Sequence, residues 1–116
     1  MKMGLSLEFD AAHRLPDYDG KCARVHGHTY EVEVVVEGPV DEESGFLMDF
    51  YDLKVIMGSV LSELDHRDLN EILDNPTAER IAEHIKAGLE GRLLETPASL
   101  VSVKLWEGKN KWVMIP

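Results

Sequence analysis

Three histidines stand where two extended segments of the chain would bring their side chains together. Residues two apart on a strand point to the same side, about 6.5 to 7 Å from one another, so His26 and His28 can converge on one ion. His13 follows an earlier alternating segment, and antiparallel pairing of the two segments would place it beside them. Three imidazoles with one open position are typical of catalytic zinc, whereas structural sites are usually closed by four ligands. The alternative is three unrelated core or surface histidines.

Cys22, the only cysteine, lies shortly before His26 and His28 in a polar stretch that includes Lys21 and Arg24. A lone cysteine has no partner for a disulfide within the chain, and a reducing cytosol is the natural compartment for a free thiol. Three roles are open for it: a small buried side chain, a fourth zinc ligand, or a catalytic base or nucleophile beside the metal. The polar surroundings speak against burial, and neighbouring cations or a metal favour the thiolate.

Two acidic side chains stand where a carboxylate can take part in chemistry. Asp65 precedes His66 near the end of an expected helix, and an aspartate can orient an imidazole that moves protons. The alternative for this pair is a histidine at the negative end of a helix. Glu107 shares the parity of Leu105 at a strand end, where it can accept two parallel N–H donors from a guanidine-like edge of a ligand. Its alternative is a place in the turn with Gly108.

The strands that carry these residues follow from the alternation of apolar and polar side chains. His13 continues the apolar face of the first strand, and the paired histidines share the face of Tyr30 on the second. On the third strand, Val101 and Leu105 are expected to share the core-facing side. The expected strands lie within residues 3–11, 25–38, 99–108 and 111–116.

A first helix is expected between the two pairs of strands. Its apolar stripe, at helical spacing, runs over residues 53–64, with Asp49 or Asp52 available as the N-cap and an end near Asp65. A further short extended segment is considered for residues 46–50.

A second helix is expected to begin at Pro76 or Thr77, because proline suits the first helical turn and Asn75 or Thr77 can cap it. The element order is then β-β-α-α-β-β, which predicts an α+β fold with two helices on one face of a four-stranded antiparallel sheet. Residues 1–116 are expected to form a single domain, because the chain has no repeat or linker and is long enough for only one core.

The second face of the expected sheet carries charged side chains, among them Glu31, Glu33 and Lys104. The sheet edges contain no obvious proline or bulge that would protect them from pairing with another chain. The sequence therefore predicts a homo-oligomer rather than a bare monomer.

The charge balance narrows the classes of partner. Twenty-two acidic residues against 12 basic ones give a net charge of -10, which argues against nucleic-acid binding through a basic face. No stretch approaches the ~20 apolar residues that a membrane span needs, and acidic residues stand where a signal peptide would have an apolar run. A cytoplasmic protein is expected.

Six segments together resemble a known family: FDAAHRL, CARVHGHTYEVEV, GFLMDFYDLK, LDHRDLN, NPTAERIAEHI and VKLWEG. They follow in order from about Leu5 to the C-terminus, and they resemble the 6-pyruvoyl-tetrahydropterin synthase family, most of all its 6-carboxy-5,6,7,8-tetrahydropterin synthase branch. The short gap between Cys22 and His26 resembles the gap in the carboxy branch, since the biopterin branch usually has a longer one. One departure is Gly108 after Glu107, where many members have threonine.

The resemblance implies the tunnelling fold, or T-fold, in which such subunits form a barrel as trimers that stack into hexamers, with active sites at subunit interfaces. It also implies a role for each candidate residue. These roles are zinc ligands for His13, His26 and His28, the catalytic base for Cys22, the proton-transfer pair for Asp65 and His66, the pterin anchor for Glu107, and backbone contacts to the pterin for Thr77 and Ala78.

The activity implied by the resemblance is that of a zinc-dependent lyase acting on 7,8-dihydroneopterin triphosphate. Cys22 and His66 would move protons, and triphosphate would leave by elimination. In the carboxy branch the side chain is then cleaved to acetaldehyde, leaving 6-carboxy-5,6,7,8-tetrahydropterin for the 7-deazaguanine route to queuosine or archaeosine. Few cations are available to bind the triphosphate, namely Lys21, Arg24, Lys109 and Lys111. A neighbouring subunit is therefore expected to contribute further cations.

Three alternatives remain beside this activity. Two belong to the same family: an enzyme that stops at the 6-pyruvoyl product, and a folate-route enzyme that cleaves the side chain to 6-hydroxymethyl-dihydropterin. The third is a metal-stabilised oligomeric binding protein, in which Cys22 would close a structural zinc site.

Overall fold

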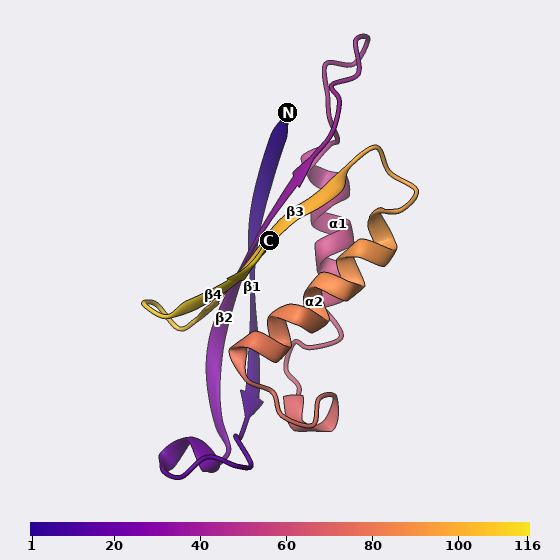
Figure 1. Ribbon diagram of the computed structural model, residues 1–116. Coiled ribbons are helices and arrows are strands. Elements are labelled where there is room, and N and C mark those ends of the chain that lie inside the picture. Colours follow the sequence, from indigo (N-terminus) through magenta and orange to yellow (C-terminus); the bar gives the residue numbers. More distant parts are fainter.

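The computed structural model describes all 116 residues as a four-stranded antiparallel sheet with two helices packed on one of its faces (Figure 1). The strand order is β1-β2-β3-β4, so β1 and β4 are the edges and the sheet is open. The elements in chain order are β1 (Lys2–His13), the short 3-10 helix η1 (Lys21–Ala23), β2 (His26–Glu37), α1 (Phe50–Leu61), the 3-10 helix η2 (Leu69–Glu71), α2 (Ala78–Leu93), β3 (Ser99–Glu107) and β4 (Trp112–Ile115). The predicted α+β fold and element order are confirmed.

The long antiparallel pair β1 and β2 sets the register on which the functional residues depend. His13 at the end of β1 is the partner of His26 at the start of β2, and Ala11 is the partner of His28. Because side chains two apart share a face, all three histidines lie on the same side of the sheet as the apolar residues of both strands. This is the side that the helices cover.

A single apolar core fills the space between the sheet and the helices. The first strand contributes Phe9 and the second contributes the valines at alternate positions from Val32, all of them fully or almost fully buried. The helices complete the core with their buried apolar side chains, Leu53, Met57, Val60 and Leu61 from α1 and Ile81, Ala82, Ile85, Leu89 and Leu93 from α2.

Side-chain caps fix where each helix begins. The Asp49 carboxylate accepts a hydrogen bond of 2.8 Å from the Tyr51 N–H, and the Thr77 hydroxyl accepts one of 3.2 Å from the Arg80 N–H. Each cap satisfies a backbone donor that the first turn of a helix leaves unpaired. Asp49 and Thr77 are both among the expected caps.

Two details of the sequence prediction are wrong, and a third, left open, is decided by the structure. The extended piece considered for residues 46–50 is not a strand, because the chain bends there into the cap of α1. The first helix ends at Leu61, and tighter turns carry the chain on to Asp65. The register of β2 and β3 shifts between Val35 and Val36, so Leu100 rather than Val101 packs against the core.

The face of the sheet away from the helices stays open. Glu8 stands opposite Glu31 in the register, which places like charges side by side. Lys104 Nζ lies 4.7 Å from the ring centroid of Trp106 and 4.1 Å from that of Trp112, in cation–π contact with both. Neither helix of the protein is long and apolar enough to cross a membrane.

Candidate active site

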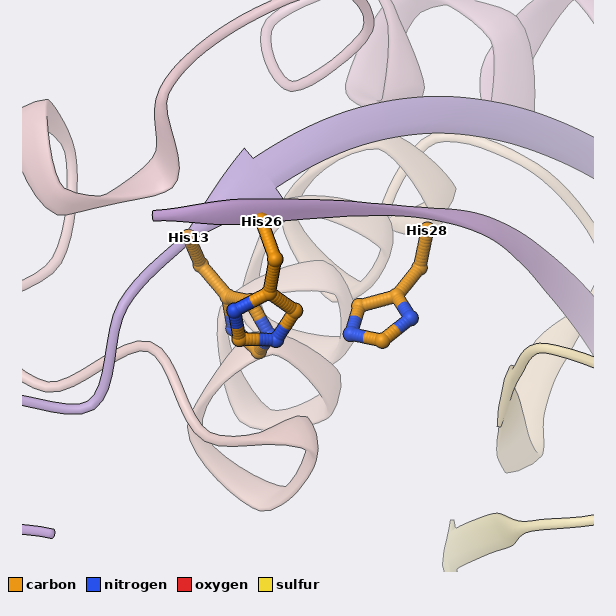
Figure 2. A group of neighbouring side chains, drawn as sticks. All are labelled: His13, His26 and His28. Carbon is orange, nitrogen blue, oxygen red and sulfur yellow. The ribbon is translucent and has the colours of Figure 1, made fainter. Parts of the chain in front are cut away.

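Three imidazoles gather at one end of the sheet, as the spacing predicted. His13 from the end of β1 and His26 and His28 from the start of β2 turn their rings toward one another on the helix-covered face (Figure 2). One ring nitrogen from each lies within 4.8 Å of the other two. His13 is only 2% exposed, and the other two are half-buried. The arrangement can hold a metal ion.

Main-chain carbonyls set the tautomer of two of these rings. His13 Nδ1 lies 2.7 Å from the Pro76 carbonyl oxygen, and His26 Nδ1 lies 2.8 Å from that of Arg24. A carbonyl only accepts, so each Nδ1 carries the proton and each Nε2 keeps its lone pair. Such an outer partner is usual for metal-binding histidines. His13 Nε2 is buried without a partner, as a ligand atom would be in the absence of its ion.

The three nitrogens lie somewhat farther apart than nitrogens that coordinate the same zinc ion. Tetrahedral zinc with Zn–N bonds of about 2.0–2.1 Å holds its nitrogens about 3.3 Å apart. The separations of up to 4.8 Å therefore require small side-chain rotations, which the half-buried His26 and His28 can make. The donor set and its supporting carbonyls fit a metal ion.

Glu107, at the end of β3, brings a carboxylate next to the cluster. Its Oε1 lies 3.4 Å from His28 Nε2, without the geometry of a hydrogen bond, and 3.7 Å from Lys111 Nζ. Burial lowers the pKa of His28, and the attraction of Glu107 offsets this only in part. His28 is therefore neutral near pH 7 and has a lone pair to offer. Glu107 itself is not among the side chains that could share one ion with the histidines.

Asp65 and His66 form the predicted pair, and the edge of β1 holds them. His66 Nδ1 lies 3.0 Å from Asp65 Oδ1. The Asp10 N–H donates to the same oxygen at 3.0 Å, and the His66 N–H donates to the Asp10 carbonyl at 2.6 Å. The hydrogen bond from Asp10 and a second from His66 hold the pKa of Asp65 below its ordinary value. The backbone of His66 has a φ of 57°, a left-handed conformation uncommon for a residue with a side chain.

Asp10 is a member of this second cluster that the sequence patterns did not predict. Its carboxylate accepts a hydrogen bond of 2.5 Å from the Thr29 hydroxyl, and it lies within 4.8 Å of the donor atoms of Asp65 and His66. Its alternation on β1 puts it on the exposed face, where an acid is unremarkable in a sequence. The contact with Asp65, 55 residues away, is visible only in the folded chain.

The two clusters remain separate within one chain. The three histidines lie on the helix-covered face, whereas Asp65 and His66 lie beside the outer edge of β1. An open hollow of about 590 Å³ has both His28 and His66 on its wall, together with Asp10, Thr29, Arg67 and others. His28 and His66 thus line the same hollow, but the two clusters do not form one compact group.

Cys22 lies in η1, in the loop that joins β1 to β2. The thiol is free and half-buried, and the Cys22 carbonyl accepts a hydrogen bond of 2.9 Å from the Leu15 N–H. Its sulfur is not among the donor atoms that gather with the three histidines. The loop lies at the same end of the molecule as the histidine cluster and the start of α2 (Figure 1).

Thr77 and Ala78 lie at the start of α2, directly after the residue that orients His13. Pro76 is buried and supplies the carbonyl to His13, Thr77 caps the helix, and Ala78 is its first residue. The backbone of these residues is therefore held next to the histidine cluster.

Most of the chain matches a known protein family and several of its members. Residues 3–116 match the family model described as 6-pyruvoyl tetrahydropterin synthase. The chain is 44% identical over 106 residues to dihydroneopterin monophosphate aldolase of Pyrococcus furiosus, with 88% of this chain and 85% of that protein covered. It is 42% identical over 91 residues to 6-carboxy-5,6,7,8-tetrahydropterin synthase of Synechocystis, with 72% and 70% covered. The solved structure of Caenorhabditis elegans 6-pyruvoyl tetrahydropterin synthase superposes with a TM-score of 0.88 at 29% identity, covering 99% of this chain and 94% of that one.

Proposed function

Because this chain belongs to the 6-pyruvoyl tetrahydropterin synthase family, we propose that it is a zinc-dependent lyase acting on 7,8-dihydroneopterin triphosphate. The products would be 6-carboxy-5,6,7,8-tetrahydropterin, triphosphate and acetaldehyde, with one water consumed to balance the oxygens. The Synechocystis relative carries the name of this activity. The product would supply the 7-deazaguanine route to queuosine or archaeosine, and the protein would act in the cytoplasm.

The observation that carries the proposal is the cluster of His13, His26 and His28. Two of its rings have their Nδ1 atoms committed to main-chain carbonyls, so their Nε2 lone pairs are turned toward the shared centre. With three protein ligands, a zinc ion would keep a position open for substrate. When bound, the ion would act as a Lewis acid on the side-chain oxygens of the substrate.

Proton transfer would fall to Cys22 and His66. Cys22 would take a proton from the side chain of the substrate, acting as a thiolate base. His66 would exchange a proton through Nε2, because its Nδ1 faces Asp65. The His66 side chain is 78% exposed, so nothing within the chain prevents a ligand from reaching it.

The pterin ring would be held by Glu107 and the start of α2. A carboxylate can accept two parallel hydrogen bonds from the amino group and ring N–H of a pterin, which resemble one edge of a guanidinium. The backbone groups of Thr77 and Ala78 lie beside the histidine cluster and would contact the ring. Lys21, Arg24, Lys109 and Lys111 would meet the triphosphate.

The active site would be completed between subunits of a trimer or hexamer. The Asp65 and His66 pair lies beside an edge strand, apart from the histidines of its own chain, and the exposed edges β1 and β4 can pair with other copies. We therefore propose that Cys22 and the zinc ligands of one subunit work with His66 of its neighbour.

A second candidate function is cleavage of the dihydroneopterin side chain without loss of its oxygens. The name of the Pyrococcus furiosus relative, 44% identical, favours this candidate. Such a retro-aldol cleavage gives a 6-hydroxymethyl pterin and a two-carbon aldehyde. It needs a base and an electrophile beside the side-chain hydroxyls, which the same residues would provide.

The test is to incubate the zinc-loaded protein with 7,8-dihydroneopterin triphosphate, and in parallel with the monophosphate, and to identify the pterin products by mass. Acetaldehyde with a 6-carboxy pterin supports the proposal. A 6-pyruvoyl product indicates elimination alone, and a 6-hydroxymethyl pterin indicates the aldolase. If neither substrate is turned over and chelation of zinc unfolds the protein, it is a metal-stabilised binding protein.

A further inference from the structure

One buried hydroxyl beside the histidine cluster has no partner. Tyr30 is 0% exposed, and its hydroxyl forms no hydrogen bond with any group of the protein. Nearly all buried polar side chains in native proteins are paired, because leaving one unpaired costs stability. The Tyr30 hydroxyl therefore needs an explanation that a structural role does not supply.

The position of Tyr30 ties it to the candidate active site. Its ring centroid lies 5.6 Å from that of His28 and 6.1 Å from that of His13. It stacks on Phe9, with the centroids 4.9 Å apart and the planes 11° from parallel, which fixes the ring. In the register of β2 and β3 its partner is Glu107, so their Cβ atoms stand about 4.5–5.5 Å apart on the same face.

We propose that Tyr30 is a positioning residue for Glu107, whose carboxylate accepts a hydrogen bond from the Tyr30 hydroxyl once the metal engages His28. The inference rests on the proposed function, because it assigns Tyr30 to the pterin anchor of that site. A carboxylate oxygen has two lone pairs. Glu107 can thus accept from Tyr30 on one side and keep lone pairs on both oxygens for the pterin.

The groups around Glu107 explain why Tyr30 is needed. The nearest is His28 Nε2, which lies 3.4 Å from Glu107 Oε1 without the geometry of a hydrogen bond. A ring nitrogen that gives its lone pair to a metal cannot donate a hydrogen bond, so this neighbour is lost when the metal binds through Nε2. Lys111 lies 3.7 Å away, but its side chain is 69% exposed, and a flexible surface ammonium fixes a carboxylate poorly. Tyr30 is the rigid, buried donor that remains.

The chemistry of the phenol agrees with this role. A phenol keeps its proton near neutral pH, so the Tyr30 hydroxyl can donate a hydrogen bond to a carboxylate. A hydrogen bond to an ionised acceptor is stronger than one between neutral groups.

The variant Tyr30→Phe removes the hydroxyl and keeps the ring, and Tyr51→Phe on the exposed surface of α1 is its matched control. The probe is pterin itself, 2-amino-4-oxopteridine, titrated by its fluorescence into the zinc-loaded protein. We expect Tyr30→Phe to bind pterin about 5–30-fold more weakly than wild type. Zinc affinity, measured against a competing chelator, should be unchanged, and the melting temperature of the metal-free protein should be unchanged or higher. In turnover, KM should rise while kcat is kept.

Other results would overturn the inference. Equal pterin affinity in Tyr30→Phe and wild type would remove Tyr30 from the anchor, and a parallel loss of zinc and pterin would mean a packing role. A larger loss in Lys111→Met than in Tyr30→Phe would make Lys111 the donor. If zinc-loaded wild type binds no pterin, both the proposed function and the inference about Tyr30 fail. If wild type binds pterin and Tyr30→Phe binds it equally well, only the inference about Tyr30 fails.

Discussion

The Nδ1–H of His13 donates a 2.7 Å hydrogen bond to the carbonyl of Pro76, and this contact joins the last residue of β1 to the residue before the cap of α2. It orients a ring that is 2% exposed and leaves its Nε2 without a partner. The strand end that carries one candidate ligand and the helix start proposed to seat the pterin are therefore fixed to each other. Metal binding and the position of Thr77 should be coupled through this hydrogen bond.

Replacing His13 by Ala should remove the metal. We expect wild type to retain about one zinc per chain after dialysis and His13→Ala to retain almost none, because two imidazoles hold the ion too weakly. Metal analysis of the purified proteins measures this, with circular dichroism to check the fold. His84→Ala is the matched control, since His84 lies on α2 outside the cluster. Full zinc occupancy in His13→Ala would exclude these histidines as the site.

The convergence of the three histidines could be predicted because it depends only on alternation and on pairing of neighbouring strands. Parity puts His26 and His28 on one face, and a pairing between consecutive strands places His13 opposite them. Glu107 was placed on the same face by the same argument, which the bulge at Val35 and Val36 did not affect because it lies nearer the other end of β3.

The environment of Asp65 could not be predicted from local patterns. It depends on the main chain at Asp10, which donates to Asp65 and accepts from His66 across 55 or more residues. The unpaired hydroxyl of Tyr30 was equally hidden, because a tyrosine in a buried strand is ordinary until the surrounding donors and acceptors are known. Long-range contacts of this kind leave no periodic signal in the sequence.

Replacing Cys22 by Ala should slow turnover strongly and leave the protein folded with its zinc. We expect kcat to fall by roughly 10²–10⁴-fold, the usual contribution of a group that transfers protons. The zinc content should not change, since the sulfur is not gathered with the three histidines. Product formation and metal content, measured on the same sample, decide the role. Loss of zinc in Cys22→Ala would make the thiol a ligand, and retained activity would remove it from the mechanism.

The stability contributed by the Asp65 carboxylate should depend on pH in one direction. Hydrogen bonds from Asp10 and His66 lower the pKa of Asp65 in the folded protein, so the ionised form is the one that folding favours. This contribution is present above the ordinary carboxyl pKa of about 4 and is lost as the pH falls through the lower folded value. Asp65→Asn should therefore melt below wild type at pH 7, and the difference should shrink below about pH 4. Asp74→Asn, at an exposed position, is the control. A difference that persists unchanged at low pH would mean that the charge is not responsible.

Mixed oligomers can test whether Cys22 and His66 of different subunits share one active site. Cys22→Ala and His66→Ala should each be inactive alone. If the site lies between subunits, random mixing of the two variants gives an intact pair at about a quarter of the interfaces, and about a quarter of wild-type activity should return. If both residues act from the same chain, no mixture contains an intact site, and activity stays absent. The variants are unfolded together, refolded with zinc and assayed, with each variant refolded alone as the control. Recovery in the mixture alone would show why two clusters that remain separate within one chain can serve one reaction.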